Sequence, residues 1–191
     1  MPSSTDPSGA RRRLLTSAFV VYLALLAWVV LWKLEAPWIG EAAALPRPLK
    51  WVPFVASGDA GASAPIEVVI NLVIFVPYGL FLGALAPTWA WWKAAAIFLG
   101  TSILLESTQH LISTGSFDTT DLIVNTAGGL IGYGIFATLR RLFGARTPAI
   151  MARVCVIVTA LALVAVVAFV ASPLHYGPQH DVVVGDRTAE R

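Results

Sequence analysis

The chain has 191 residues, of which 57% are hydrophobic and 13% are charged, and its mean hydropathy is +0.75. This composition excludes a sizeable water-soluble domain and indicates an integral membrane protein. The net charge of +2 does not indicate a nucleic-acid partner, because topology places the basic residues of a membrane protein, and the single Cys155 excludes an internal disulfide and a thiolate metal site.

The first predicted element is a transmembrane helix over residues 14–32, which follows a basic arm at 1–13. This run is close to the 20 or so apolar residues that cross a bilayer. A cleaved signal peptide is the alternative, since small residues at 42–44 resemble a cleavage site, but the apolar run is longer than the roughly 7 to 15 residues of such a signal. Residues 33–65, rich in proline, glycine and tryptophan, predict an extracytoplasmic loop.

Three closely spaced spans are predicted to form a core over residues 66–139. The second span of the chain contains Pro77, which we expect to kink the helix. The third covers about 92–113 and the fourth about 119–139, with only short connections between them. Two pairs of small residues in the second and fourth spans predict close helix packing, namely Gly79 with Gly83 and Gly128 with Gly132.

A basic loop at 140–153 leads to a fifth span at 154–172 and to a flexible tail at 173–191. If the spans alternate in direction, most basic residues fall on one side of the membrane: Arg11, Arg12, Arg13, Lys93, Arg140, Arg141, Arg146 and Arg153. The positive-inside rule assigns that side to the cytoplasm. The sequence therefore predicts an all-α polytopic membrane protein with about five transmembrane helices, its N-terminus cytoplasmic and its C-terminus outside.

Polar residues gather at the outer ends of the three core helices. They are Glu67 and Asn71 in the second, Glu106, Gln109 and His110 in the third, and Asp118, Asp121 and Asn125 at the start of the fourth. Helical spacing places the polar residues of each helix on one stripe. A carboxylate inside a membrane helix costs at least about 2.5 kcal/mol, so we expect these stripes to face each other and to form a small polar pocket open to the exterior.

Structural explanations compete with this one. Asp118 and Asp121 are typical of a helix start, where a carboxylate caps free amides and meets the positive end of the helix dipole. Glu67 and Asn71 can be ordinary first-turn residues. Capping does not explain Glu106, which lies in the middle of its helix.

His110 follows Glu106 by one helical turn and is either an interfacial histidine or a proton carrier that shares a proton with Glu106. A metal site is a further alternative, since Glu106, His110, Asp118 and Asp121 offer oxygen and nitrogen ligands. No zinc-motif spacing is present, however, and we predict neither a metal nor a cofactor.

Three stretches in this order, "NLVIFVPYGLFL", "LLESTQHLI" and "SFDTTDLIVNTAGGLIGY", resemble the VanZ-like membrane protein family over about residues 67–136. The resemblance implies a multi-pass protein of the bacterial cell membrane and a link with resistance to the glycopeptide antibiotic teicoplanin, but no established reaction. Its characteristic positions here are Asn71, Pro77, Gly79, Glu106, Gln109, Asp118, Asp121, Asn125, Gly128 and Gly132.

One departure from the family concerns charge. Many relatives have an arginine shortly before the first aspartate of the third motif, where this chain has Gly115 and Ser116. Either Glu106 is then partly protonated, His110 substitutes for the arginine, or an arginine-dependent activity is absent. Arg47 or Lys50 of the outer loop can also supply the charge.

From these features we predict a protein that binds or acts on a cell-envelope or lipid-linked molecule at the outer leaflet. Glu106 is the candidate acid or base, with Asp118 and Asp121 orienting the substrate and His110 a weaker candidate. Substrate binding is assigned to Asn71, Gln109, Asn125 and Glu67. The alternatives are a structural or partner-binding membrane module and a proton-coupled transporter, which would need polar residues continuing inward. The oligomeric state is left open.

Overall fold

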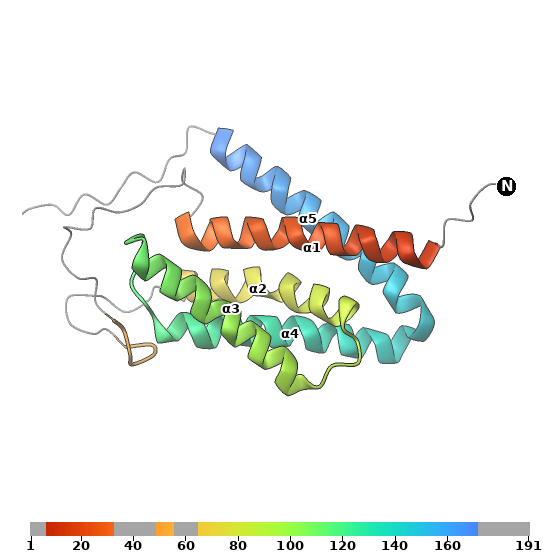
Figure 1. Ribbon diagram of the computed structural model, residues 1–191, viewed down its shortest axis with the longest axis horizontal. Helices are drawn as coiled ribbons and strands as arrows, with labels where there is room; N and C mark the ends of the chain where they lie inside the picture. The colour runs from red at the N-terminus through yellow and green to blue at the C-terminus, as the bar shows by residue number, and fades with distance from the viewer. Residues whose placement is uncertain (1–6, 33–48, 56–64, 172–191) are drawn as a thin grey trace, which may run out of the picture.

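Helices account for nearly all the residues that the computed structural model describes, which are 7–32, 49–55 and 65–171 (Figure 1). They are α1 (Pro7–Trp32), α2 (Pro65–Leu85), α3 (Trp91–Leu111), α4 (Thr119–Phe143), the short 3-10 helix η1 (Gly144–Arg146) and α5 (Thr147–Ala171). No strand occurs in this part of the chain. Most of the predicted loop at 33–65 and the whole of the predicted tail at 173–191 lie outside the described residues, and so do Lys33 and Arg47.

The connection between α4 and α5 is shorter than the sequence predicted. We expected a basic loop at 140–153, but α4 continues to Phe143 and α5 begins at Thr147. Arginine is a good helix former, so the helices extend beyond their apolar runs. The turn is made at Gly144, whose positive φ of 52° suits glycine and whose N–H bonds to the carbonyl of Arg140.

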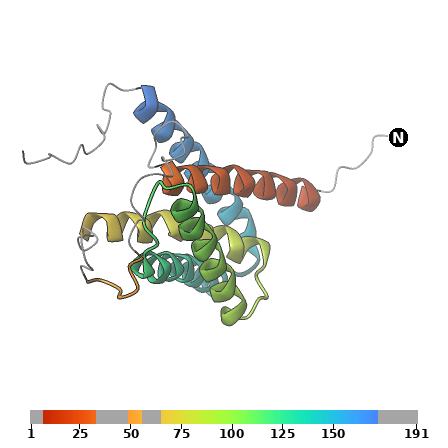
Figure 2. The same cartoon turned by 60° about the vertical axis from the view of Figure 1, so that its left-hand side comes forward.

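The bundle is organised around a parallel pair, α2 and α4, which make the most extensive helix contact in the structure. α3 runs in the opposite direction and packs on α4, while α1 and α5 pack against each other and against α2 (Figures 1 and 2). The described part of the chain therefore has two ends. One carries the starts of α2 and α4, and the other carries their ends.

Glycines allow α2 and α4 to approach each other. A Cβ atom on Gly79 would overlap the carbonyl of Gly129, and one on Gly132 would overlap the carbonyl of Val76. A Cβ on Gly128 would meet the carbonyl of Leu72. The close packing predicted for the glycine pairs is confirmed, because a larger residue at these positions would push the two backbones apart.

The core between the helices is aromatic. Phe75, Phe81 and Phe98 are fully buried, and the ring of Tyr78 contacts Phe98 edge to face with the centroids 5.0 Å apart. The Tyr22 hydroxyl of α1 donates to the Ile74 carbonyl, in the turn of α2 before Pro77. The kink expected at Pro77 stays a prediction.

Three stretches of the described chain are long and apolar enough to cross a membrane: Gly9–Trp32, Pro65–Leu85 and Thr119–Ala171. The third has 53 residues and contains both α4 and α5, more than one crossing of about 20 residues needs. α3 is as long as α2 but is not among them. An all-helical fold with long apolar stretches is therefore confirmed, whereas the number of crossings and their direction stay predictions.

Charged side chains are segregated between the two ends. The described acidic residues, Glu67, Glu106, Asp118 and Asp121, all lie at the end where α2 and α4 begin. Every described lysine and arginine except Lys50 lies toward the other end, where α1, α3 and α5 begin and α4 ends. The bundle thus groups its arginines as the sequence predicted.

Candidate functional site

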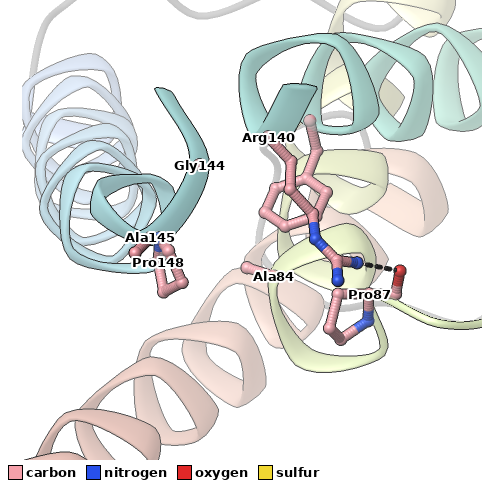
Figure 3. Close-up of a pocket in the computed structure, with 7 residues that line it drawn as sticks. Ala84, Pro87, Arg140, Gly144, Ala145 and Pro148 are labelled. Atoms are coloured by element: carbon pink, nitrogen blue, oxygen red, sulfur yellow. Dashed lines mark hydrogen bonds between the residues drawn. The ribbon is translucent and has the colours of Figure 1, made fainter. Parts of the chain in front are cut away.

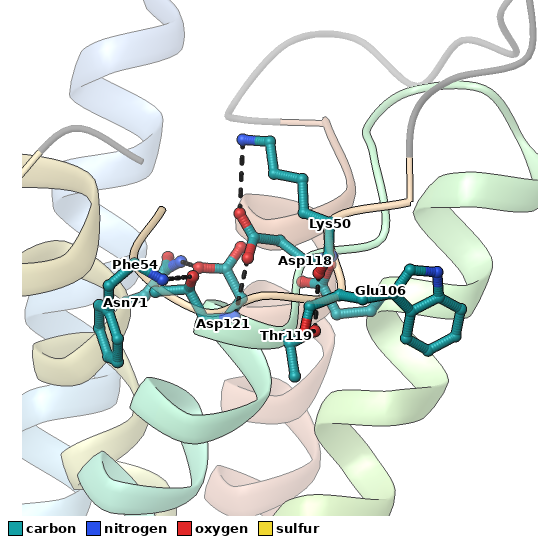
Figure 4. A network of polar contacts seen from close by, with 9 residues as sticks. Lys50, Phe54, Asn71, Glu106, Asp118, Thr119 and Asp121 are labelled. Carbon is teal, nitrogen blue, oxygen red and sulfur yellow. Dashed lines mark hydrogen bonds and ion pairs between the residues drawn. The ribbon is translucent and has the colours of Figure 1, made fainter. Parts of the chain in front are cut away.

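The start of α4 forms the centre of a polar cluster that we define as Lys50, Asn71, Ser102, Glu106, Asp118, Asp121 and Asn125. Figure 4 shows five of these residues, Lys50, Asn71, Glu106, Asp118 and Asp121. Asp118 is the N-cap of the helix. Its backbone is extended and its Oδ1 accepts a hydrogen bond from the backbone N–H of Thr120 at 2.8 Å. The capping role predicted for Asp118 is confirmed, and it fixes this carboxylate beside the other polar side chains.

Among the acidic residues that the structure describes, Glu106 is the most deeply buried, with 1% of its surface exposed. Its Oε2 accepts a hydrogen bond from the backbone N–H of Asp118 at 3.1 Å. Asp121 lies close enough to the same carboxyl group for the two acids to interact. Two neighbouring carboxyl groups are able to share a proton, which makes this pair a candidate proton site.

Polar side chains join the three core helices at this level. Asn71 of α2 donates through Nδ2 to Oδ1 of Asp121 at 2.8 Å. Asn125 of α4 donates through Nδ2 to the Ser102 hydroxyl of α3 at 3.0 Å, and this hydroxyl lies 3.4 Å from the Asp121 carbonyl. Part of each predicted polar stripe thus lies together at this level, and its role as a site stays a prediction. The Oδ1 atom of Asn125 is buried and has no hydrogen-bond partner among the described residues.

Three predicted site residues lie at the edge of the cluster or point elsewhere. Gln109 donates through Nε2 to the Val30 carbonyl at 2.6 Å, so its amide joins α3 to α1. Among the described residues His110 makes no hydrogen bond with Glu106, and its Nδ1 is buried without a partner. Glu67 is exposed in the first turn of α2. Their predicted roles in catalysis or binding stay predictions.

Sequence reasoning did not foresee that residues 49–55 would lie along the start of α4, and we call this segment the strap. The Lys50 N–H donates to the Phe117 carbonyl at 2.9 Å, and the Thr119 N–H donates to the Lys50 carbonyl at 3.1 Å. The N–H of Phe54 donates to the Thr120 hydroxyl at 2.9 Å. Pairing between backbones so far apart in sequence leaves no periodic signal by which to predict it.

The strap brings a cation to the cluster. Nζ of Lys50 lies 3.5 Å from Oδ2 of Asp118, and the Lys50 side chain is 13% exposed. The sequence offered Arg47, Lys50 and His110 as substitutes for the missing arginine. Lys50 is one of these residues that the structure places beside a carboxylate. On its other side the strap exposes large apolar side chains, with 66% of Trp51 and 57% of Phe54 accessible. Tryptophan is enriched at the membrane interface.

Burial closes the inner part of the cluster, around Glu106 and Asn125. Glu106 and Asn125 are each 1% exposed, and their neighbours are bonded to one another. The pocket open to the exterior stays a prediction. In the part of the chain that the structure describes, no group of three or more His, Cys, Asp or Glu side chains is arranged to hold a metal ion, so the metal alternative gains no geometric support.

These features define a helical protein whose long apolar segments surround a buried polar layer. Residues 19–141 match the model of the VanZ/LLP1 family, more than half of the chain. Protein VanZ of Enterococcus faecium is 32% identical over 116 residues, which cover 61% of this chain and 69% of that protein. No solved structure matches.

The chain therefore belongs to the VanZ/LLP1 family and is a multi-pass bacterial membrane protein. The predicted resemblance is confirmed, and the match is longer than the 67–136 that the three motifs covered. It includes part of α1 and the strap.

Proposed function

We propose that this protein binds a cell-envelope or lipid-linked molecule at the outer leaflet, through the polar cluster, and that Glu106 serves there as an acid or base. The observation that carries the proposal is the placement of the Glu106 carboxyl. It is buried in mid-helix, accepts the Asp118 amide and lies against the Asp121 side chain. A proton held between carboxyl groups is available to a substrate oxygen that reaches them.

Lys50 and Asp118 extend this chemistry to charged substrates. The ammonium group lies 3.5 Å from the aspartate, so an anionic group such as a phosphate can compete with Asp118 for it. The strap that carries Lys50 also exposes Trp51 and Phe54, which suit contact with lipid beside the site. These two properties favour an amphiphilic ligand with an anionic head.

The proposed topology has five crossings, with the N-terminus in the cytoplasm. Successive helices reverse direction from α2 to α5, and the arginines lie at the end where α1 begins (Figure 1). With that end in the cytoplasm by the positive-inside rule, the polar cluster lies under the outer surface. Under this topology α3 also crosses the bilayer, and Glu106 contacts other helices rather than lipid.

The relative named Protein VanZ motivates a proposed phenotype, resistance to the glycopeptide teicoplanin. A protein that binds or alters an envelope molecule at the outer leaflet is placed where such an antibiotic acts. We infer that any resistance depends on the polar cluster.

A structural role is the second candidate, and the closed state of the cluster favours it. Asn71, Ser102 and Glu106 each bond to α4, so the cluster ties three helices together without a ligand. A proton-coupled transporter is less well supported, because the fully buried rings of Phe75, Phe81 and Phe98 fill the core on the inner side of the cluster.

Replacing Glu106 tests these readings. Glu106→Gln keeps an oxygen that can accept the Asp118 amide but removes the acid. We expect normal abundance in the membrane together with loss of teicoplanin resistance in a bacterial host. Leu104→Ala, on the lipid-exposed face of the same helix, is the matched control and keeps both. Resistance that survives Glu106→Gln at normal abundance would favour the structural role.

A further inference from the structure

A cavity of ≈ 360 Å³ lies at the end of the bundle opposite the polar cluster, where α2 and α4 end and α5 begins (Figure 3). Its volume is within the range of small-molecule sites. The lining includes Ala84, Pro87, Phe136, Ala145 and Pro148, which are apolar, and Arg140. Among the described lining residues Arg140 alone is charged, so its guanidinium group is what a polar ligand would meet.

Arg140 is oriented by a backbone contact. Its Nη1 donates to the Pro87 carbonyl at 2.5 Å, across the gap between the end of α4 and the turn after α2. A guanidinium group has five N–H donors in a fixed plane, so this bond fixes the group and leaves donors for an oxyanion.

The surroundings of the cavity are basic and border the apolar surface. Arg141 and Arg146 are exposed beside it, and the described acidic residues all lie at the opposite end. Leu142 and Phe143, next along the chain, are also exposed, with 69% of Leu142 accessible. Cationic groups at the edge of an apolar belt are placed at the headgroup level of a bilayer.

We propose that this cavity binds the headgroup of an anionic phospholipid. Arg140 contacts the phosphate, and the apolar lining covers the glycerol and the first carbons of the acyl chains. Basic pockets between transmembrane helices bind such headgroups because charge attraction and partial burial act together. The site is separate from the proposed function of the polar cluster, at the other end of the molecule.

Native mass spectrometry of the purified full chain tests this proposal. The protein is titrated in detergent with equal amounts of phosphatidylglycerol and phosphatidylcholine, and retained lipids are counted. We expect the wild type to retain phosphatidylglycerol preferentially and Arg140→Gln to lower that preference about fivefold, the order expected for one basic group near an anionic lipid. Arg140→Lys keeps the charge and is expected to retain part of the preference.

Two variants separate this cavity from general surface charge. Arg141→Gln removes a neighbouring charge that does not line the cavity, and we expect at most about a twofold change. Ala145→Leu fills the cavity but keeps Arg140, and we expect it to lower retention as well. Thermal unfolding in phosphatidylcholine alone shows whether each variant is folded.

Equal losses in Arg140→Gln and Arg141→Gln would overturn the proposal in favour of diffuse charge, as would the absence of a phosphatidylglycerol preference in the wild type. Unchanged phosphatidylglycerol retention in a folded Ala145→Leu protein would show that the lipid binds outside this cavity. Displacement of the lipid by excess inorganic phosphate would identify a free anion as the ligand instead.

Discussion

The two ends of the bundle hold their charged groups in opposite ways. At the polar cluster the carboxyl groups are buried or half-buried and are paired with amide groups and with a lysine. At the other end the arginines are exposed, and Arg140 borders an open cavity. A buried polar group that loses its partner costs free energy, whereas an exposed group is solvated in its absence. We therefore expect burial and pairing, rather than charge, to determine how much a substitution at each end lowers the free energy of unfolding.

The largest expected effect comes from the close contact between α2 and α4, which extends from one end of the bundle toward the other. Gly132→Leu would place a side chain where the Val76 carbonyl lies, and we expect a loss of at least about 3 kcal/mol in the free energy of unfolding and little folded protein. Gly100→Ala is the control, because a Cβ there meets no atom within 4 Å. Membrane abundance and thermal unfolding in detergent measure both. A Gly132→Leu protein as stable as wild type would contradict the close α2–α4 contact.

The next effect contrasts the ends directly. Glu106→Ala removes the acceptor of the buried Asp118 amide, and we expect it to destabilise the protein by about 2 to 3 kcal/mol. Arg140→Ala removes an exposed side chain and should cost less than about 1 kcal/mol. Thermal unfolding of the two variants in the same detergent compares them. Equal costs would mean that burial does not separate the two ends.

A smaller effect is expected at the helix cap. Asp118→Ala should cost about 1 to 2 kcal/mol, because the Thr120 N–H loses its acceptor. Asp118→Asn keeps a side-chain oxygen that can cap α4, so it should retain most of the stability while losing the charge that faces Lys50. Hydrogen exchange of the first turn of α4 reports the cap. Similar exchange in both variants would show that charge, not capping, is what Asp118 supplies.

The smallest expected effect is at the edge of the cluster. Lys50→Gln removes an ion pair that is still partly open to solvent, and we expect a loss of about 0.5 kcal/mol that shrinks at high salt. Lys50→Arg should restore it. The measurement is thermal unfolding at low and high ionic strength. A loss of several kcal/mol would show that the ion pair between Lys50 and Asp118 behaves as a buried pair, and would favour a site that is closed to solvent.

How far the sequence predicted this molecule depends on how local the signal is. The five helices follow from apolar runs of sufficient length, and the convergence of Glu106, Asp121 and Asn125 follows from helical spacing combined with the cost of exposing carboxylates to lipid. The start of α5 was missed, since hydropathy does not distinguish a basic helix end from a basic loop. The bond of Gln109 to α1 depends on packing between elements distant in sequence.

The strap shows the same limit at the site itself. Lys50 was one of several charges that could reach the carboxylates, and only the three-dimensional arrangement places it beside Asp118. Its position is set by backbone bonds to Phe117 and Thr119, for which side-chain patterns give no indication. Likewise, a stripe of polar residues predicts that helices meet but not whether they leave an opening between them.

The parallel pairing of α2 with α4 has a consequence for biosynthesis. During translation α2 leaves the ribosome before α3 and α4. The surface of α2 around Gly79 therefore has no packing partner until the part of α4 that contains Gly129 has been synthesised. Glu106 is likewise synthesised before Asp118, whose amide it accepts in the folded protein. If α3 crosses the membrane as proposed, an unpaired carboxyl in it is costly, so α3 should remain near the translocon or the interface until α4 has been made. The packing of α4 against α2 and α3, rather than the insertion of any one segment, would then decide whether the chain folds or is degraded.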